Sequence, residues 1–433
     1  MDNEEANVAT SKIGSIFAVR FTQWLPGAFL LGCIIMLFTA VYTVFESYPV
    51  PLLKYSSIGN QQPIIHNFSN PRSDVYEMIG DIRLNGSSAT ILMVSNSENN
   101  MTPVTVKPYA RKADNCAMQN VREWKITAEA NVASPRCSQT ITTPAVVFST
   151  AGYSGNHFHD FSDTLLPLYL TSRQFNRSVL FLVTNAQDWW ISKHYTILDS
   201  LSSYNILDID SQNEVLCFSR VIIGLKADKD LRADHPSPPH YSMLDFAQFL
   251  RNVYSLGRES VKDFHGFRLP RMLIISRQHS RRINNEGDVV DMARGVGFDV
   301  IAEEMGHNID SVAHLVNSVD VMVGVHGAGL TNQIFLPKDA VVIQIMPIGL
   351  DVLPHFYDFP PKDLKLRYIG YSVSLNESSL FGKYPMDSEV FTNPRAIQEY
   401  EEFKSIYLDN QDLNIDVSKF RETILKAKEL LEP

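Results

Sequence analysis

A glycine-rich segment, residues 321–332, combines residue types that could hold a phosphate group. An apolar stretch typical of a buried strand runs into the turn His-Gly-Ala-Gly at residues 326–329, and we expect a helix to begin directly after it. Glycines let backbone amides come close to a ligand, and the amides at the start of a helix favour negative charge. The pattern predicts a site for a nucleotide diphosphate, although a glycine turn also occurs wherever a strand must bend sharply.

His326 is the one ionisable side chain of this turn, and it could donate a hydrogen bond to a phosphate oxygen or to a carbonyl group. The nearest approach to the dinucleotide fingerprint Gly-x-Gly-x-x-Gly is residues 327–332, which end in asparagine instead of glycine. The chain contains no Gly-Lys-Ser/Thr phosphate loop. Both observations count against a dehydrogenase and against a nucleoside triphosphatase.

A second candidate for chemistry lies at residues 155–163, where His159 and Asp163 are four positions apart. If a helix begins here, the two side chains share one face and can touch. A histidine in contact with a carboxylate can act as a general acid/base pair. The spacing therefore predicts a catalytic pair that faces a cleft.

Two other interpretations of residues 155–163 stay open. The segment could simply be a capped helix start, in which Asn156 or Asp160 accepts hydrogen bonds from free backbone amides. It could also bind a metal ion, although the spacing of its ligand-type side chains matches no strong zinc pattern. Those side chains are His157, His159, Asp160 and Asp163.

A basic cluster, Arg277, Arg281 and Arg282, follows the apolar run at residues 271–277. If that run is a strand of an α/β domain, the arginines stand where strand ends open toward a ligand, and their guanidinium groups suit pyrophosphate. A solvated basic loop would have the same sequence. Glu286, a few residues later, could accept ribose hydroxyls or merely pair with an arginine.

Two acidic residues, Asp208 and Asp210, have the Asp-x-Asp spacing by which many sugar transferases hold a divalent ion on the donor pyrophosphate. They end an apolar segment that begins at Tyr204. A strand end followed by a turn explains them equally well, so the sequence leaves both interpretations open.

The spacing of apolar residues predicts the elements that position these segments. Short apolar runs, as in buried parallel strands, alternate with stretches of helical spacing. We expect strands at 144–149, 179–184, 215–225, 271–277, 298–302, 319–325 and 340–346, and helices at 163–175, 189–204, 241–257, 288–296, 309–317, 330–335 and 418–431. Two successive sets of this kind predict an α/β protein with two doubly wound domains that face a cleft, at residues 104–260 and 261–433, joined by a linker at 258–270.

The beginning of the chain follows a different pattern. Residues 25–45 carry no charge, and at about 1.5 Å per residue they would span roughly 30 Å of hydrocarbon. We expect a transmembrane helix there, with residues 1–24 as a cytoplasmic tail and residues 46–103, rich in Pro, Ser, Asn and Gly, as a flexible stem. A cleaved signal peptide is the alternative.

Glycosylation sequons follow the apolar run, and they are compatible with a lumenal body. They lie at Asn67, Asn85, Asn100, Asn176 and Asn376. The part after the run contains three cysteines, which cannot all pair with one another, and we expect Cys116 to pair with Cys137 and to leave Cys217 free.

The composition narrows the class of protein. With 433 residues, 45% of them hydrophobic and 20% charged, the chain can form two or three ordered globular domains. A net charge of −10 argues against a nucleic-acid partner, because phosphate backbones are bound by clustered lysines and arginines.

Several of these segments resemble the motifs of glycosyltransferase family 61, and the resemblance runs from about Tyr109 to the C-terminus. The matching strings occur in the family's order and are most similar to the plant branch that acts on xylan. They are Arg111–Asp114, Glu123–Ile126, Pro144–Thr150, Asn156–Asp163, Leu273–Arg277, Val316–Asn332 and Phe335–Pro337.

The resemblance implies a GT-B fold, with two Rossmann-like domains that face a cleft, and an inverting transfer from a UDP-sugar with no obligatory metal ion. It implies a pentose donor (arabinofuranose or xylose), a xylan acceptor, and a single-pass type II Golgi membrane protein whose catalytic domain is lumenal; it leaves room for an oligomer. Two alternatives are the transfer of xylose or N-acetylglucosamine to glycoproteins, as in more distant relatives, and a non-catalytic lumenal glycan-binding protein.

Residue by residue, the resemblance places Asn156, His159 and Asp163 near the acceptor, with His159 or Asp163 as the catalytic base or as the residue that orients it. On the donor side it places Arg277 and Glu286 beside the glycine turn. The turn itself would contribute His326, Gly327, Ala328, Gly329, Leu330 and Thr331.

Overall fold

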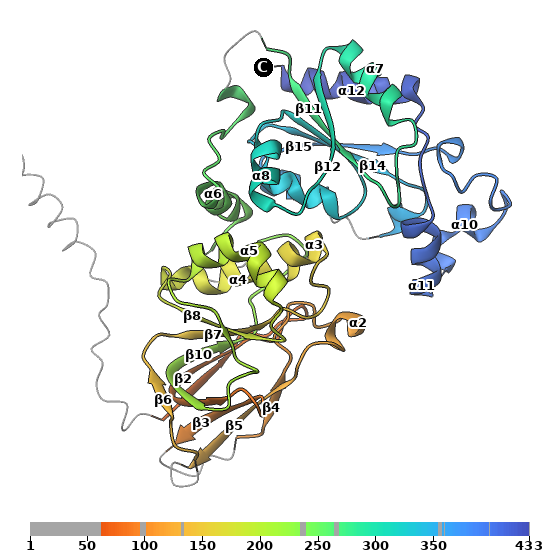
Figure 1. Cartoon of the computed structure of the whole chain (residues 1–433). Coiled ribbons are helices and arrows are strands. Elements are labelled where there is room, and N and C mark those ends of the chain that lie inside the picture. Colours follow the sequence, from red (N-terminus) through yellow and green to blue (C-terminus); the bar gives the residue numbers. More distant parts are fainter. Residues whose placement is uncertain are drawn as a thin grey trace, which may run out of the picture. The chain divides into compact units, whose positions relative to one another are not determined.

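Figure 1 shows the computed structural model of the 433-residue chain. The structure describes residues 62–95, 101–130, 134–233, 240–263, 268–353, 357–358, 360–397 and 399–432, all of which belong to one compact unit. The membrane span expected at residues 25–45 and the tail before it lie outside the described residues. None of the described helices is both long enough and apolar enough to cross a bilayer.

The second half of the chain contains a sheet of five parallel strands in the order β12-β11-β13-β14-β15. The strands are β11 (Arg271–Ser276), β12 (Asp299–Glu304), β13 (Val321–Val325), β14 (Val341–Met346) and β15 (Arg367–Ser372). Along β11 the side chains alternate between two cores, since Met272 and Ile274 face one and Leu273 and Ile275 face the other. A strand buried on both faces needs an unbroken apolar run, which is why the sequence predicts β11, β13 and β14 well. The sequence does not predict β15, whose residues are only partly buried.

Helices cover both faces of this sheet (Figure 1). On one face α7 (Glu286–Val296) packs against α12 (Val417–Leu431). On the other face lie α8 (Ile309–Asn317) and the 3-10 helix η5 (Ala328–Phe335). The second half is therefore doubly wound, as expected, and its strand order changes direction between β11 and β13. Such a switch point leaves a crevice at the carboxyl ends of the two strands, where α/β proteins bind ligands.

Short helices complete the second half. They are η6 (Leu350–Val352), α9 (Pro360–Asp363), η7 (Leu375–Glu377), α10 (Glu389–Thr392), η8 (Pro394–Ala396), α11 (Tyr400–Phe403) and η9 (Lys404–Asp409). A small apolar cluster that includes Leu350, Leu380 and Tyr407 holds several of them together.

The first half is built on a ten-stranded mixed sheet with the main order β4-β5-β3-β2-β10-β7-β8-β9, in which β1 also pairs with β2 and β6 with β10. The strands are β1 (Ile64–Asn67), β2 (Tyr76–Asn85), β3 (Thr90–Ser95), β4 (Val104–Val106), β5 (Trp124–Ala130), β6 (Gln139–Ile141), β7 (Ala145–Ser149), β8 (Leu180–Thr184), β9 (Leu207–Asp208) and β10 (Val215–Ile223). Strands β7 to β10 run parallel, whereas β2 is antiparallel to both β10 and β3.

The expectation of a flexible stem at residues 46–103 is wrong for residues 64–95, which form β1, β2 and β3. Strand β2 lies inside the sheet, and its side chains Met78, Ile82 and Leu84 are fully buried. Their spacing of two and four residues is the alternation of a half-buried strand. The Ser, Asn and Gly residues of the adjoining turns dominate the composition there and obscure the alternation.

Only one face of this sheet is covered by helices, so the first half is not the doubly wound domain that the sequence predicts (Figure 1). One continuous helical segment consists of α3 (His157–His159), the π-helix η2 (Asp160–Leu165), α4 (Leu166–Ser172) and the 3-10 helix η3 (Arg173–Phe175), and α5 (Asp188–Leu201) lies beside it. Among the described residues, the core on the opposite face receives no helix residue and consists of side chains from the strands and their adjoining turns. Trp124 of β5 and Leu182 of β8 share that core although their strands are distant in the sheet order, because the sheet curves onto itself.

The two halves are joined through α6 (Met243–Val253), which contacts α5 in the first half and η5 and α9 in the second. One apolar cluster continues across both halves, and the rings of Phe161 and Phe335 meet edge to face in it. The expected linker begins at Arg258, whose buried guanidinium pairs with Asp320, and it includes η4 (Val261–Asp263). The short α2 (Asn115–Met118) lies between β4 and β5.

A disulfide joins Cys137 to Cys217, which corrects the expected pair Cys116–Cys137. Strand β6 pairs in parallel with β10, with Thr140 opposite Cys217, and this pairing brings Cys137 to its partner. Cys116 is exposed and free. A pairing that depends on the packing of distant strands cannot be deduced from cysteine positions alone.

Replacing Cys137 with serine should lower the free energy of unfolding by about 2–5 kcal/mol, because the bond restricts the unfolded chain across 80 residues of sequence. The matched change Cys116→Ser should alter it by less than about 0.5 kcal/mol, since that thiol is exposed. Urea denaturation of both variants provides the measurement. Equal stability of the two would contradict the assigned pairing.

Candidate functional site

Two arginines converge on the glycine turn at the switch point between β11 and β13. Gly327 has a φ of +153°, which residues with a side chain rarely adopt, and a methyl group on it would lie 2.9 Å from Nη1 of Arg277 and 3.0 Å from Nη1 of Arg281, so both guanidinium groups meet at this glycine. Arg277 donates from Nε to the carbonyl of Ser280 at 2.7 Å, and Arg281 donates from Nη1 to the carbonyl of His326 at 2.6 Å. The loop after β11 and the turn after β13 thus form one cationic surface.

This pair of arginines lacks a negative partner. Among the described residues, neither Arg277 nor Arg281 forms an ion pair with a carboxylate. Burial and the neighbouring charge of Arg277 lower the pKa of Arg281 to about 10, and burial lowers the pKa of Arg277. Buried like charges are unfavourable unless a ligand neutralises them, and strongly perturbed groups of this kind mark binding sites. The arrangement selects an anion.

The position of the proton on His326 follows from its neighbours. The Tyr368 hydroxyl donates to Oε1 of Gln344 at 2.9 Å, which orients the amide so that its Nε2 donates to Nδ1 of His326 at 2.8 Å. Nδ1 is therefore the acceptor, and Nε2 of the ring carries the hydrogen. Burial, together with the charges of Arg281 and Arg277, lowers the pKa of His326 to about 3. His326 stays neutral and offers an N–H donor.

The other residues in and around the turn either pack in the core or line a cavity. Leu330 and Thr331 are fully buried, backbone included, so neither of the two is exposed to a ligand. Gly324 is needed for packing, because a Cβ atom there would lie 2.9 Å from a methyl carbon of Leu330. Gly329 lines a cavity, whereas Ala328 begins η5.

That cavity, of about 260 Å³, lies at the carboxyl ends of β11 and β12. Arg277 and the loop at residues 304–307 line it from the second half, and His157 and Lys193 line it from the first. Ser276 also lines the cavity, whereas Glu286 does not. Glu286 accepts a hydrogen bond at 2.9 Å from the Ser276 hydroxyl. Lys193, whose ammonium is held at 2.9 Å from Oδ2 of Asp160, has no motif around it that marks it in the sequence.

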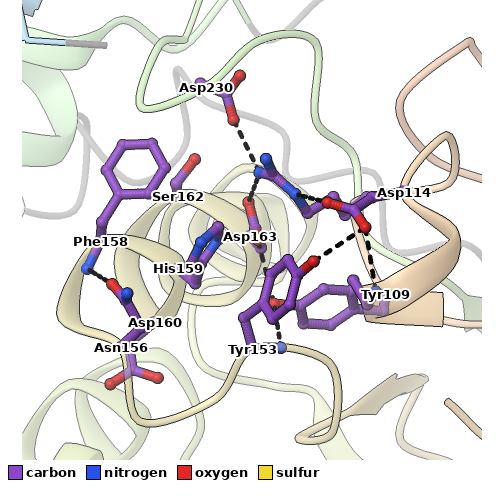
Figure 2. Close-up of polar contacts among 12 residues, drawn as sticks. Tyr109, Asp114, Tyr153, Asn156, Phe158, His159, Asp160, Ser162, Asp163 and Asp230 are labelled. Carbon is purple, nitrogen blue, oxygen red and sulfur yellow. Dashed lines mark hydrogen bonds and ion pairs between the residues drawn. The ribbon is translucent and has the colours of Figure 1, made fainter. Parts of the chain in front are cut away.

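The predicted His159–Asp163 pair is formed (Figure 2). Nδ1 of His159 lies 2.8 Å from Oδ2 of Asp163, and the side chain of Asp163 is fully buried while that of His159 is 15% exposed. An ionised carboxylate only accepts hydrogen bonds, so Nδ1 carries the hydrogen and Nε2 is left as a free base. The α3–η2 helix creates the contact through its four-residue spacing.

Arginines that the sequence did not identify hold Asp163 in place. Oδ1 of Asp163 lies 2.7 Å from Nη2 of Arg72 and 3.4 Å from Nη1 of Arg111, and both arginines also bind Asp230, at 2.8 and 3.1 Å. The Tyr109 hydroxyl donates to Oδ2 at 3.1 Å, and burial and this carboxylate raise the pKa of the phenol above its usual range. Arg111 stands in one of the family strings, but Arg72 lies in the segment expected to be stem, and nothing near it in sequence indicates a partner at residue 163.

Other candidates of this segment have structural roles. Asn156 is exposed and accepts a hydrogen bond at 3.0 Å from the amide of Phe158, so it caps the helix and the capping interpretation holds for it. Asp160 accepts hydrogen bonds from the Trp190 indole at 2.8 Å and from His194 at 3.2 Å. The histidines and aspartates of residues 155–163 do not gather into a metal-binding group within the described part of the chain.

The Asp-x-Asp pair is likewise part of the sheet structure. Oδ1 of Asp210 accepts a hydrogen bond from the Thr184 hydroxyl at 2.7 Å, and Oδ2 accepts one from the amide of Asn185 at 2.8 Å. Arg122 forms an ion pair with the same carboxylate at 2.7 Å. These contacts support the interpretation as a strand end followed by a turn.

Helix α3 contributes to both sites, since His157 lines the cavity and His159 belongs to the His159–Asp163 pair. His157 points toward the second half, with its Nε2 2.8 Å from Oδ1 of Asn332. The ring of Phe158 touches that of Tyr357, which in turn touches His326, at centroid distances of 5.6 and 5.3 Å. Phe158 and Tyr357 thus lie between the His159–Asp163 pair and the glycine turn.

The chain belongs to glycosyltransferase family 61. The model of that family, described as glycosyltransferase 61, matches residues 155–343, a range that contains the His159–Asp163 pair, both arginines and the glycine turn. The resemblance seen in the sequence is thus confirmed.

Relatives of the chain include plant enzymes. It is 40% identical to an α-1,3-arabinosyltransferase of Oryza sativa subsp. japonica, with 85% of this chain and 65% of the other covered. It is 38% identical to a β-1,2-xylosyltransferase of the same plant, with 84% of each covered. It is 33% identical to a xylan glycosyltransferase of Arabidopsis thaliana, with 82% and 77% covered. The chain thus spans about two thirds, 65%, of the first of these relatives.

Likeness to solved structures is low. An iron-containing heptosyltransferase superposes with a TM-score of 0.32 at 12% identity, with 85% of this chain and 96% of the other covered. A score at this level does not establish a shared fold.

Replacing Gly327 with alanine should weaken the binding of inorganic pyrophosphate about tenfold or more, because the new methyl group would overpack the two guanidinium groups at a cost of about 1–3 kcal/mol. Calorimetric titration measures the affinity. The matched control is Gly295→Ala, which introduces the same methyl group on exposed α7 with nothing within 4 Å. Equal affinities of the two variants would show that the arginine pair does not hold the anion.

Proposed function

We propose that this protein is an inverting glycosyltransferase that moves a pentose, arabinofuranose or xylose, from a UDP-sugar to xylan. One observation carries the proposal: two partly buried arginines, which form no ion pair with a carboxylate of the described residues, meet at a glycine turn, and a His–Asp pair lies beyond Tyr357 and Phe158. The first arrangement suits a leaving diphosphate and the second suits a base. The pentose and the xylan are supported by the names of the plant relatives.

The donor is assigned to the second half of the chain. Arg277, Arg281 and the N–H group of His326 would bind the diphosphate, with the amides of residues 327–329. The neighbouring cavity would hold the nucleoside, where Ser276 and its partner Glu286 are placed to meet ribose hydroxyls. Two guanidinium groups supply positive charge that a metal ion supplies in other transferases, so we expect activity without a divalent ion.

The acceptor is assigned to the first half, so donor and acceptor would bind to different halves of the chain. In an inverting reaction the acceptor hydroxyl attacks the anomeric carbon directly and must lose its proton. Nε2 of His159 takes that proton, and the buried Asp163 carboxylate fixes the tautomer and stabilises the imidazolium that forms. Asp163 itself is enclosed by other side chains, so its role is to position His159.

The proposed location is the Golgi lumen, with residues 25–45 as a type II membrane anchor. The Cys137–Cys217 disulfide supports an oxidising compartment. Two of the sequon asparagines, Asn176 and Asn376, are exposed and could carry glycans in the lumen.

Incubation of the protein with UDP-arabinofuranose or UDP-xylose and xylo-oligosaccharides should give a pentosylated product of inverted anomeric configuration, in the presence of a metal chelator as well as in its absence. Product mass and NMR coupling constants provide the measurement. Transfer from UDP-xylose or UDP-N-acetylglucosamine to a glycoprotein instead would favour the glycoprotein-modifying alternative. UDP binding without any product would favour a glycan-binding protein.

Replacing His159 with alanine should reduce kcat by roughly 10²–10⁴-fold, which is the usual contribution of a general base, with UDP affinity nearly unchanged. Asp163→Asn should produce a loss of the same order, because the amide can no longer impose the required tautomer. His314→Ala is the matched control, since that side chain is 53% exposed on α8. Turnover at the wild-type rate in both site variants would overturn the assignment of the base.

A further inference from the structure

We propose that a second pocket binds the glycan acceptor. This acceptor pocket is formed by Arg72 with its preceding proline, by Arg111 and residues 113–116, and by residues 228–230, and it has a volume of about 670 Å³. That volume is within the range of about 300–1,000 Å³ that is usual for ligand pockets. The inference rests on the proposed transferase function and adds where the acceptor lies.

The charges of the pocket favour a neutral ligand. Three lining residues are positive (Arg72, Arg111 and Lys229) and three are negative (Asp114, Asp228 and Asp230), so the formal charges cancel. An anion such as a nucleoside diphosphate would meet as much repulsion as attraction there, in contrast to the arginine pair at Gly327. Guanidinium groups donate hydrogen bonds and carboxylates accept them, and an uncharged sugar with several hydroxyl groups can use both.

Two hydrogen-bonding atoms beside the pocket lack partners. Oδ1 of Asp228 accepts from the side chain of Asn70 at 3.2 Å, but Oδ2 is buried with no partner among the described residues. The same is true of Nε of Arg72. A buried polar atom without a hydrogen bond is unfavourable, and more so when it is charged. A sugar hydroxyl would supply the missing hydrogen bond once the Asp228 carboxylate turned toward the pocket.

Two arginines that line the pocket are connected to the proposed base through Asp163. Arg72 and Arg111 line the pocket, and each also contacts both Asp230 and Asp163. Asp163 in turn holds His159, so the pocket and the imidazole are linked through two successive ion-paired or hydrogen-bonded contacts. Figure 2 shows Asp230, Asp163 and His159 in one view, with Tyr153 and Asp114 beside them. The donor cavity adjoins the other end of α3, at His157. Donor and acceptor would thus approach the reacting centre from opposite sides of this helix.

The first test fills the pocket without removing a polar group. Ala113 is exposed and lines the pocket, so Ala113→Trp should raise the KM for a xylo-oligosaccharide at least tenfold, with the affinity for UDP unchanged. The matched control Asn120→Trp places the same indole on an exposed residue outside the pocket, and its KM should equal that of the wild type. An unchanged KM in Ala113→Trp would overturn the proposal.

The second test uses a thiol that the pocket already contains. Cys116 is free, exposed and part of the lining, so an oligosaccharide bound there should shield it from N-ethylmaleimide. At ten times the dissociation constant, labelling of the Cys116 peptide, followed by mass spectrometry, should slow about tenfold, because only unoccupied protein reacts. UDP alone should not slow it. Labelling that is unaffected by saturating xylo-oligosaccharide, or that is slowed by UDP instead, would overturn the proposal.

The two proposals can fail separately. Transfer by the wild type, combined with unchanged KM in Ala113→Trp and unprotected Cys116, would leave the proposed function standing and remove the acceptor pocket. Protection of Cys116 by the oligosaccharide in a protein that transfers no sugar would retain the pocket and remove the enzyme.

Discussion

The buried carboxylate of Asp163 is the constraint on which the rest of the site depends. An ion taken out of water costs several kcal/mol unless other groups replace its hydration. Arg72, Arg111, Tyr109 and His159 replace it here, and they come from three separate stretches of the chain. The carboxylate can be buried only when all three are in place. The turn before β2, the loop before α2 and the α3–η2 helix are therefore fixed relative to one another by a single side chain.

The charged clusters of the two halves have different roles. The cluster in the first half stabilises the fold, and the cluster in the second half is suited to bind a ligand. Around Asp163 the charged groups satisfy one another, so the cluster maintains its own geometry without a ligand. At the switch point, Arg277 and Arg281 lie side by side, partly buried, and their pKa values are lowered, so that cluster is less stable alone than with an anion. Arginine thus stabilises the fold in the first half, whereas in the second half it is available to bind a ligand.

The parts of this site that depend on local order along the chain are predictable from sequence, and the parts that depend on long-range packing are not. The His159–Asp163 contact follows from helical spacing, and the position of Arg277 follows from an apolar run buried on both faces. Arg72, in contrast, is 91 residues from its partner, and its surroundings resemble a linker. Asn156 shows a different limit of prediction from sequence. An asparagine before a helix looks the same in the sequence whether it caps the helix or binds a ligand. Arg282 stands beside Arg281 in the basic cluster but pairs with Asp412 at 2.6 Å on the surface.

The placement of β2 in the middle of the first sheet has a consequence for how the protein is made. During synthesis β2 leaves the ribosome early, yet its neighbour β10 is about 130 residues further along, and the residue pair Val215 and Asn85 must still find each other. Contacts between such distant segments slow folding, because a long loop must close before they are gained. The edge of β2 that pairs with β10 stays unpaired until residue 223 has been made. Arg72 likewise cannot form its ion pair with Asp230 until residue 230 has been made. An unpaired strand edge is a template for aggregation, so the nascent first half needs protection during this interval.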